Sequence, residues 1–119
     1  MANVNLKSLT TVLGENASIA DIPITATGIV TCDNNQVLKV NSLYVANIDG
    51  VNSATITADL YSGSTVLSYF VKGTSVGAGG SINIITSETP VYVTEGQSIR
   101  LTASASGDLS GFVSYERIS

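Results

Sequence analysis

Residues 53–61 read "SATITADLY", and this stretch decides the fold class. Its apolar residues stand at every second position, at Ala54, Ile56, Ala58 and Leu60. A period of two is what a β-strand shows when one face of its sheet is buried and the other meets water. Residues 98–105, "SIRLTASA", repeat the same alternation. Both stretches therefore predict strands with one buried face.

Further strand-like runs fill most of the chain. They cover residues 4–13, 25–32, 37–48, 65–72, 81–86, 90–93 and 112–118. Turn signals separate them, namely Asp33-Asn34-Asn35, Asp49-Gly50, Ser62-Gly63-Ser64, Glu95-Gly96 and Ser106-Gly107-Asp108. Short strands at this spacing are typical of an all-β sandwich or barrel.

Helical periodicity is almost absent from the sequence, so the crossover helices of a parallel sheet are missing. We therefore predict an all-β fold: a single antiparallel β-sandwich of about eight strands, either jelly-roll or immunoglobulin-like. The whole chain, residues 1–119, is expected to form this one domain. Residues 1–13 are expected to form an N-terminal arm or an edge strand.

Charged residues are scarce. Only 12% of the residues are charged, against roughly 25% in an average domain, and the net charge is −4. The basic residues stand singly, at Lys7, Lys39, Lys72, Arg100 and Arg117. Nucleic acids and anionic membranes attract clustered cations. The composition therefore argues against nucleic acids and membranes as partners. It favours a surface that is neutral and rich in hydroxyl groups, or one that is partly covered by another molecule.

Two runs carry apolar residues on both faces. In residues 65–71, "TVLSYFV", strict alternation places Phe70 on one face and Tyr69 and Val71 on the other. Residues 43–46, "LYVA", repeat the pattern. A sheet face in water alternates more cleanly. Either a loop or the N-terminal segment covers the second face, or a neighbouring subunit does; with so little charge, we favour the subunit.

Residue sets that carry catalysis or bind metals are missing. The chain has no histidine and one cysteine, so catalytic triads and ordinary zinc sites cannot form within it. Cys32 is expected to be a small buried side chain, with an interchain disulfide as the alternative. Asp33-Asn34-Asn35 lacks the glycine and glutamate of a calcium loop and predicts a turn. We expect no enzyme activity, no catalytic or metal-binding residue and no cofactor.

The five tyrosines all lie in strand-like runs, at Tyr44, Tyr61, Tyr69, Tyr92 and Tyr115. Their expected role is packing or an interface. Paired carboxylates could still meet in space, as in glycosidases. Carbohydrate enzymes usually line their clefts with aromatic residues, however, and the chain has no tryptophan.

Residues 76–85, "VGAGGSINII", look at first like a phosphate-binding loop. A Walker loop needs a Gly-Lys pair, which is absent, and a dinucleotide loop needs a third glycine where Ile82 stands. A strand, not a helix, is expected to follow, so no helix N-terminus receives a phosphate. We predict that the glycines, Gly79 and Gly80 among them, provide positive φ for a tight connection.

The start of the sequence has no charged leader followed by an apolar core, so no secretion signal is expected. No apolar run approaches the roughly 20 residues of a membrane helix. Asn16-Ala17-Ser18 matches a glycosylation sequon, and without a secretion signal we expect this match to be accidental.

Four stretches together resemble a known family. They are "SLYVANIDG" at residues 42–50, "AGGS" at 78–81, "EGQSIRLTAS" at 95–104 and "SYERIS" at 114–119. Their order resembles that of small β-sandwich virion structural proteins of tailed bacteriophages. The resemblance covers roughly residues 37–119 and contains no catalytic signature.

The resemblance implies a non-enzymatic virion protein, in particular a capsid decoration (cement) protein that stabilises the shell by bridging capsid subunits. It implies a homo-oligomer, with a trimer favoured, and the major capsid protein or other virion proteins as further partners. The expected location is the virion, assembled in the host cytoplasm. Residues 1–13 would add a strand to the sheet edge of a neighbour.

Three alternatives stay open. The first is an accessory protein of the neck, tail or fibre of the particle. The second is a receptor-binding or glycan-binding tip domain, for which an exposed aromatic platform would be needed. The third is a non-viral surface or adhesin-like β-domain, which the lack of a secretion signal disfavours.

Overall fold

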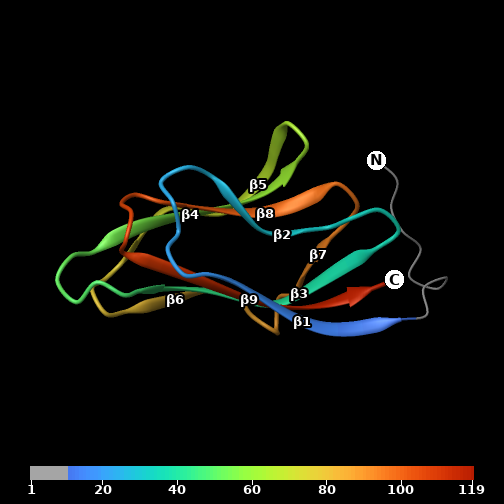
Figure 1. Ribbon diagram of the computed structural model, residues 1–119, viewed down its shortest axis with the longest axis horizontal. Coiled ribbons are helices and arrows are strands. Elements are labelled where there is room, and N and C mark those ends of the chain that lie inside the picture. Colours follow the sequence, from blue (N-terminus) through green and yellow to red (C-terminus); the bar gives the residue numbers. More distant parts are fainter. Residues whose placement is uncertain (1–10) are drawn as a thin grey trace.

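A computed structural model describes residues 11–119, and every regular element in that part of the chain is a β-strand (Figure 1). The strands are β1 (Val12–Ile19), β2 (Thr27–Thr31), β3 (Val37–Asn47), β4 (Ala54–Ser62), β5 (Thr65–Val76), β6 (Ser81–Ile85), β7 (Val91–Val93), β8 (Gln97–Ala103) and β9 (Leu109–Ile118). Within these residues no helix is long and apolar enough to cross a membrane.

The strands form two antiparallel sheets. Sheet A has the order β1-β9-β3-β6, and β7 also pairs with β3. Sheet B has the order β2-β8-β4-β5. Because β6 pairs with residues 43–46 of β3 and β7 with residues 38–40, these two short strands share one position in sheet A. Nine strands thus occupy eight positions, in agreement with the expected number.

The order of the strands is that of a jelly roll. β1 pairs with β9, β2 with β8, β3 with β6 and β7, and β4 with β5. The chain therefore follows one long hairpin that is rolled up, so that successive pairs of strands alternate between the two sheets. This is the double-sheet jelly-roll arrangement. The prediction of an antiparallel β-sandwich is confirmed, and of the two expected topologies the jelly roll is the one formed.

The core lies between the two sheets. It contains apolar residues that the alternating sequence pattern predicted to be buried. From sheet B, Ile56 on β4 and Leu101 on β8 are fully buried. From sheet A, Leu43 and Val45 on β3 and Val113 on β9 are equally buried. Burying a large aliphatic side chain contributes roughly 1.5–3 kcal/mol relative to leaving it exposed. The strong period of two in residues 53–61 therefore reflects the burial of one sheet face.

Gly111 on β9 lets a side chain of the opposite sheet come close. A Cβ atom at this position would lie 2.7 Å from Cδ1 of Leu101 and 3.4 Å from Cδ1 of Ile22. Both of those residues are fully buried, so they fill the space that a side chain at position 111 would need. A side chain at position 111 would therefore force Leu101 to shift within the packed core.

Loops gather at the two ends of the sandwich. Residues 20–26, 48–53, 77–80 and 104–108 meet at one end, which we call the four-loop end. Backbone hydrogen bonds join three of them, from Ile48 N to Asp108 O (2.7 Å) and from Gly79 N to Asp49 O (3.1 Å). Loop 20–26 is joined to loop 104–108 by the bond from Gly107 N to Asp21 Oδ1 (2.7 Å). At the opposite end, Gly96 N donates to Cys32 O (3.1 Å), so loops 94–96 and 32–36 lie together.

Most of the first described strand was not predicted from the sequence. Of the strand expected over residues 4–13, only residues 11–13 belong to the described part of the chain, whereas β1 spans Val12–Ile19. This stretch contains Gly14, Glu15 and Asn16, which are residue types depleted in strands. Eight consecutive pairings with β9 override that preference. Asn16, the asparagine of the glycosylation sequon, lies in the middle of this edge strand, and its side chain is exposed.

The predicted arm or edge strand of residues 1–13 falls mostly outside the described residues, which begin at 11. Its last two residues, Val12 and Leu13, open β1 at the edge of sheet A.

Strict alternation fails in β5. The pairing of β4 with β5 shifts register at three places, between residues 56 and 58, 58 and 59, and 60 and 61. Phe70 and Val71, which were predicted on opposite faces, consequently both pack against the core, while Leu67 and Tyr69 remain about half exposed. In residues 43–46 the alternation holds, and Tyr44 is the exposed residue between two buried ones.

Candidate functional site

Residues 11–119 contain no grouping typical of a catalytic or metal site. No three of their His, Cys, Asp or Glu side chains lie close enough to share a metal ion, and no pocket opens among them. The polar side chains that do cluster form two ion-pair networks and one group of carboxylates. Each of these has a structural explanation.

The glycine-rich segment forms a tight turn between β5 and β6. Gly80 N donates to Gly77 O at 2.8 Å, which closes a four-residue turn, and Gly79 at its third position has a φ of 70°. A type II turn requires positive φ at that position, which favours glycine. Gly79 N also bonds to Asp49 O, so this amide holds the four-loop end together. The prediction of a connecting turn is confirmed.

Gly80 differs from its prediction, because its φ is not positive. What restricts position 80 to glycine is the lack of room for a side chain. A Cβ atom at Gly80 would lie 3.2 Å from Gly77 O, which is closer than most side chains approach a backbone oxygen.

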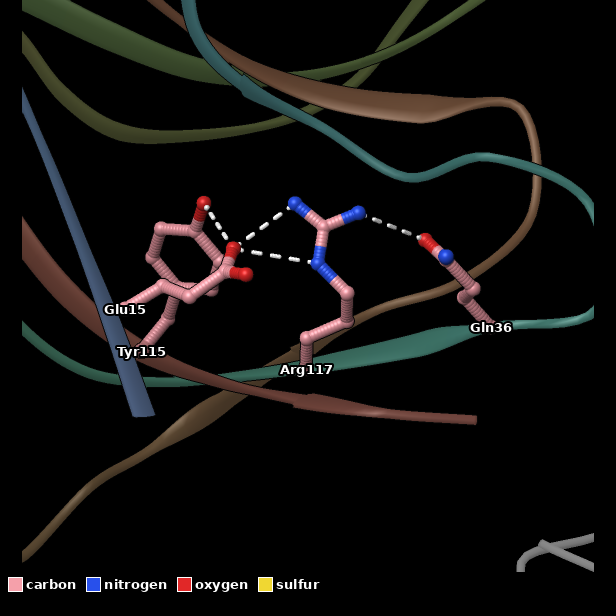
Figure 2. A network of polar contacts seen from close by, with 4 residues as sticks. All are labelled: Glu15, Gln36, Tyr115 and Arg117. Carbon is pink, nitrogen blue, oxygen red and sulfur yellow. Dashed lines mark hydrogen bonds and ion pairs between the residues drawn. The ribbon is translucent and has the colours of Figure 1, made fainter. Parts of the chain in front are cut away.

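The first network links β1 to β9 at the end of the sandwich opposite the four-loop end (Figure 2). Arg117 donates to Oε1 of Glu15 from Nε (3.0 Å) and from Nη2 (2.7 Å), and the Tyr115 hydroxyl donates to the same oxygen (2.9 Å). Nη1 of Arg117 donates to Oε1 of Gln36 at 3.1 Å. Edge strand β1 is thereby fixed to its neighbour and to loop 32–36.

The same hydrogen bonds set the protonation of the network. The bond from Arg117, followed by that from Tyr115, lowers the pKa of Glu15. The bond to Glu15 raises the pKa of Arg117 in return. Burial, together with the bond to Glu15, raises the pKa of Tyr115. Glu15 is therefore a stably ionised partner of Arg117 and a poor proton acceptor at neutral pH.

The second network lies on the outer face of sheet B. Arg100 on β8 donates to Asp59 on β4 from Nε (2.9 Å) and from Nη2 (3.2 Å). The carboxylate side chain is only 4% exposed. The Arg100 guanidinium also lies 3.7 Å from the centre of the Tyr61 ring, and Lys72 Nζ lies 4.8 Å from the centre of the Tyr69 ring.

These cation contacts bear on the glycan-binding alternative. A sugar stacks on an aromatic ring only where a ring face is open. On sheet B the rings of Tyr61 and Tyr69 are each contacted by a cation of the same chain. Such contacts contribute roughly 0.5–1 kcal/mol at exposed sites. The geometry therefore disfavours this face as a sugar platform.

Three carboxylates lie together at the four-loop end. Asp49 Oδ1 accepts from Val51 N (2.8 Å), and Asp21 Oδ1 accepts from Gly107 N (2.7 Å). The bond from Val51, followed by those from Asn52, lowers the pKa of Asp49, whereas burial and then the hydrogen bond to Asp49 raise the pKa of Asp108. The carboxylates shape the loops by accepting backbone N–H bonds, as aspartates commonly do in turns.

Acidic residues are distributed unevenly over the fold. Six of the nine lie in loops, namely Asp21, Asp33, Asp49, Glu88, Glu95 and Asp108. In the strands, Glu15 and Asp59 are paired with arginines. Glu116 is the remaining one. The negative charge of the chain therefore belongs to the loops, while the sheet faces are nearly neutral.

Cys32 is buried, as the sequence predicted. It is 2% exposed, and its Sγ–H donates to Gln36 O at 3.2 Å. Burial raises the pKa of this thiol. A buried, protonated thiol is a poor nucleophile and a poor partner for an interchain disulfide.

Two glycines of the turn, Gly77 at its first position and Gly79 at its third, allow a matched test. Replacing Gly79 by alanine places a side chain at positive φ, which costs roughly 1–2 kcal/mol. Gly77→Ala is the control, because a Cβ there meets nothing within 4 Å and its φ is not positive. We expect Gly79→Ala to lower the free energy of unfolding in urea by about 1 kcal/mol and Gly77→Ala to change it little. Equal effects would contradict the proposed turn geometry.

The Glu15 network predicts a pH dependence of stability. Because the folded protein lowers the pKa of Glu15, its contribution is fully present above the unfolded-state pKa, at about 4.3, and is lost as the pH falls through the folded-state pKa. Glu15→Gln should therefore destabilise the protein most at neutral pH and progressively less in acid. Urea unfolding from neutral pH to about pH 3 measures this difference. Glu88→Gln, which removes the same charge from an exposed loop residue outside the ion pairs of residues 11–119, is the control and should have a smaller effect.

Comparisons with known proteins bear on the fold. The sequence matches no protein-family model, and no curated protein matches it. A solved structure with a similar fold is that of Bacillus endospore appendages, described as a novel family of disulfide-linked pili. The two chains share 18% sequence identity with a TM-score of 0.55, over 98% of this chain and 95% of that one. At this identity the similarity supports the all-β sandwich fold and nothing further.

Proposed function

We propose that the chain is a non-enzymatic structural subunit of a bacteriophage particle, and within it a capsid decoration (cement) protein that bridges capsid subunits. The observation that carries this proposal is the outer surface of sheet A. It is a broad sheet face with little charge, and Tyr44 and Tyr92 stand on it 40% and 48% exposed. Tyrosines with little surrounding charge are typical of surfaces that bind other proteins.

Two further points support the proposal. The sequence resemblance to phage virion proteins spans most of the strands, and its stretches fall on β3, β8 and β9 and on the turn before β6. The jelly roll is also a fold that viral capsid domains use. Lectin domains use it too, so the fold by itself does not decide between assembly and sugar binding.

A decoration protein works by burying surface across joints between shell subunits. A typical specific interface buries about 800 Å² on each partner. Each contact contributes little, but the sum over many copies resists the pressure of the packaged genome. A stable fold with neutral faces suits this role, because it can bind without the repulsion that a net charge of −4 would otherwise produce.

A second candidate is a subunit of a filament on a bacterial surface. The fold similarity to the endospore appendage, over nearly the full length of both chains, favours it. Those pili are described as disulfide-linked. The 119 residues have one cysteine, which is buried, and one thiol can join two chains but not a continuous filament. A filament of this chain would therefore be held by non-covalent contacts.

Quantitative mass spectrometry of purified particles, with the major capsid protein as the internal standard, tests the proposal. A decoration protein should be present in hundreds of copies per particle. About six to twelve copies, the number set by ring symmetry, would instead indicate the neck or tail. Absence from particles would contradict the virion role, and filaments containing the chain on the cell surface would then support the second candidate.

A further inference from the structure

The outer face of sheet A carries two residues of opposite charge, side by side. In the β3–β9 register, Lys39 faces Glu116. Cross-strand partners share a face. Leu38 and Val40, on either side of Lys39, are buried in the core, as is Tyr115 next to Glu116. Lys39 and Glu116 therefore both point away from the core on neighbouring strands.

These two are the charged residues that the described part of sheet A presents on its outer face. The strand registers place small polar residues around them, namely Asn16, Ser18, Ser42, Asn83, Ser110 and Ser114. This face is therefore neutral in a chain whose net charge is −4. Two copies of an acidic protein approach with the least electrostatic repulsion through a neutral face.

Lys39 and Glu116 do not form an ion pair with each other within the chain. Among residues 11–119 the ion pairs of 4 Å or less are Arg100–Asp59 and Arg117–Glu15. No such pair joins Lys39 to Glu116. Both arginines of the fold are thus committed to partners within the chain, whereas this lysine and this glutamate remain able to form an ion pair with another molecule.

An aromatic pair occupies the same two strands. Tyr44 on β3 faces Phe112 on β9, with ring centres 5.4 Å apart and ring planes inclined by 33°. Tyr44 is 40% exposed, although its own neighbours Leu43 and Val45 are fully buried. Partly exposed aromatic residues near the centre of a neutral face are the usual anchors of a protein interface.

Symmetry makes this face complementary to itself. Consider a two-fold axis that lies just outside the outer face of sheet A. It runs parallel to the strands, above the line midway between β3 and β9. It brings Lys39 of one copy over Glu116 of the second copy, and Glu116 over Lys39. The same operation brings Tyr44 over Phe112 of the second copy. Both matches arise from one axis, because both pairs belong to the same β3–β9 register.

We propose that two copies of this chain associate face to face through sheet A, with reciprocal Lys39–Glu116 ion pairs at one level of the strands and the Tyr44–Phe112 aromatic cluster five positions further along β3. The strands of the two sheets run nearly parallel to the axis, which corresponds to the aligned packing, within about 30°, that stacked sheets prefer. Sheet B suits this role less well, since Lys72 leaves its outer face with a net positive charge and its tyrosine rings contact cations of the same chain.

This contact differs from the three-fold arrangement that the phage resemblance implies. A three-fold contact joins two different surfaces, whereas Lys39 and Glu116 complement each other only within one face. The inference concerns the contact between copies and does not require the virion. It uses the same outer face of sheet A from which the proposed function is argued, so in a dimer that face is covered by the second copy and not by a capsid subunit. The copy number in particles therefore tests the proposed function separately.

Charge reversal with mixing tests the contact. We expect the purified protein to sediment as a dimer in analytical ultracentrifugation. Lys39→Glu and Glu116→Lys each place like charges at both symmetric contacts, and each should raise the dissociation constant about tenfold or more. An equimolar mixture of the two variants should recover the dimer, because both contacts again join opposite charges.

The mixing step separates a contact between copies from an effect within one chain. Either variant alone puts like charges on neighbouring strands, and mixing cannot repair that. Circular dichroism and urea unfolding confirm that each variant is folded. Lys72→Glu makes the same charge change on sheet B and should leave the dimer intact.

Several results would overturn the proposal. They are a wild-type monomer at every concentration, a trimer, a mixture that stays monomeric, or a dimer that Lys72→Glu disrupts as much as Lys39→Glu does.

Discussion

The pairing of β3 with β9 is the interaction on which the rest of the structure depends. It joins ten residue pairs at the centre of sheet A and brings the last strand of the chain back to the middle of the fold. Its inner side supplies core residues such as Leu43 and Val113, and Gly111 leaves room there for Leu101 of the opposite sheet. Its outer side holds Lys39 next to Glu116 and Tyr44 next to Phe112. One register therefore determines both the packing of the core and the pattern of the exposed face.

The distribution of charge follows from this architecture. Strands in a two-sheet sandwich have one buried face, so their charged residues are few and mostly paired, as for Asp59 with Arg100. The loops have no such constraint, and there the carboxylates accept backbone N–H groups. The acidic character of the chain is consequently confined to the ends and loops of the fold. The broad faces are left neutral enough to bind another protein, which is the property that both the decoration role and the self-association require.

Much of the fold could be predicted from local patterns. The period of two in residues 53–61 and 98–105 identified β4 and β8, and the turn signals between the runs match the loops. Residues 14–19 of β1 were not predicted as a strand, because the pairing of β1 with β9 overrides the weak strand preference of Gly14 and Asn16. In β5 the register shifts break the alternation. Gly73, with a φ of 64°, marks the shift opposite Thr57, but no residue type marks the two shifts between residues 58 and 61. Local periodicity therefore predicts strands well and predicts bulges poorly.

The side-chain networks lay beyond what the sequence could reveal. Glu15 and Arg117 are about a hundred positions apart, and neither stands in a motif. Asp59 and Arg100 did occupy outward positions of two alternating strands, which was a usable signal, but their contact depends on β4 and β8 being neighbours. The same holds for Lys39 and Glu116. Such pairs become visible only when the order and register of the strands are known.

The central claim is that this protein acts by binding another protein surface through the neutral outer face of sheet A. Hydroxyl-radical footprinting of the tyrosines, compared between the dilute monomer and the associated state, tests it most directly. The account predicts that Tyr44 and Tyr92 on sheet A lose reactivity on association, while Tyr69 on sheet B keeps its reactivity. Protection of Tyr69 with unchanged reactivity at Tyr44 and Tyr92 would contradict it.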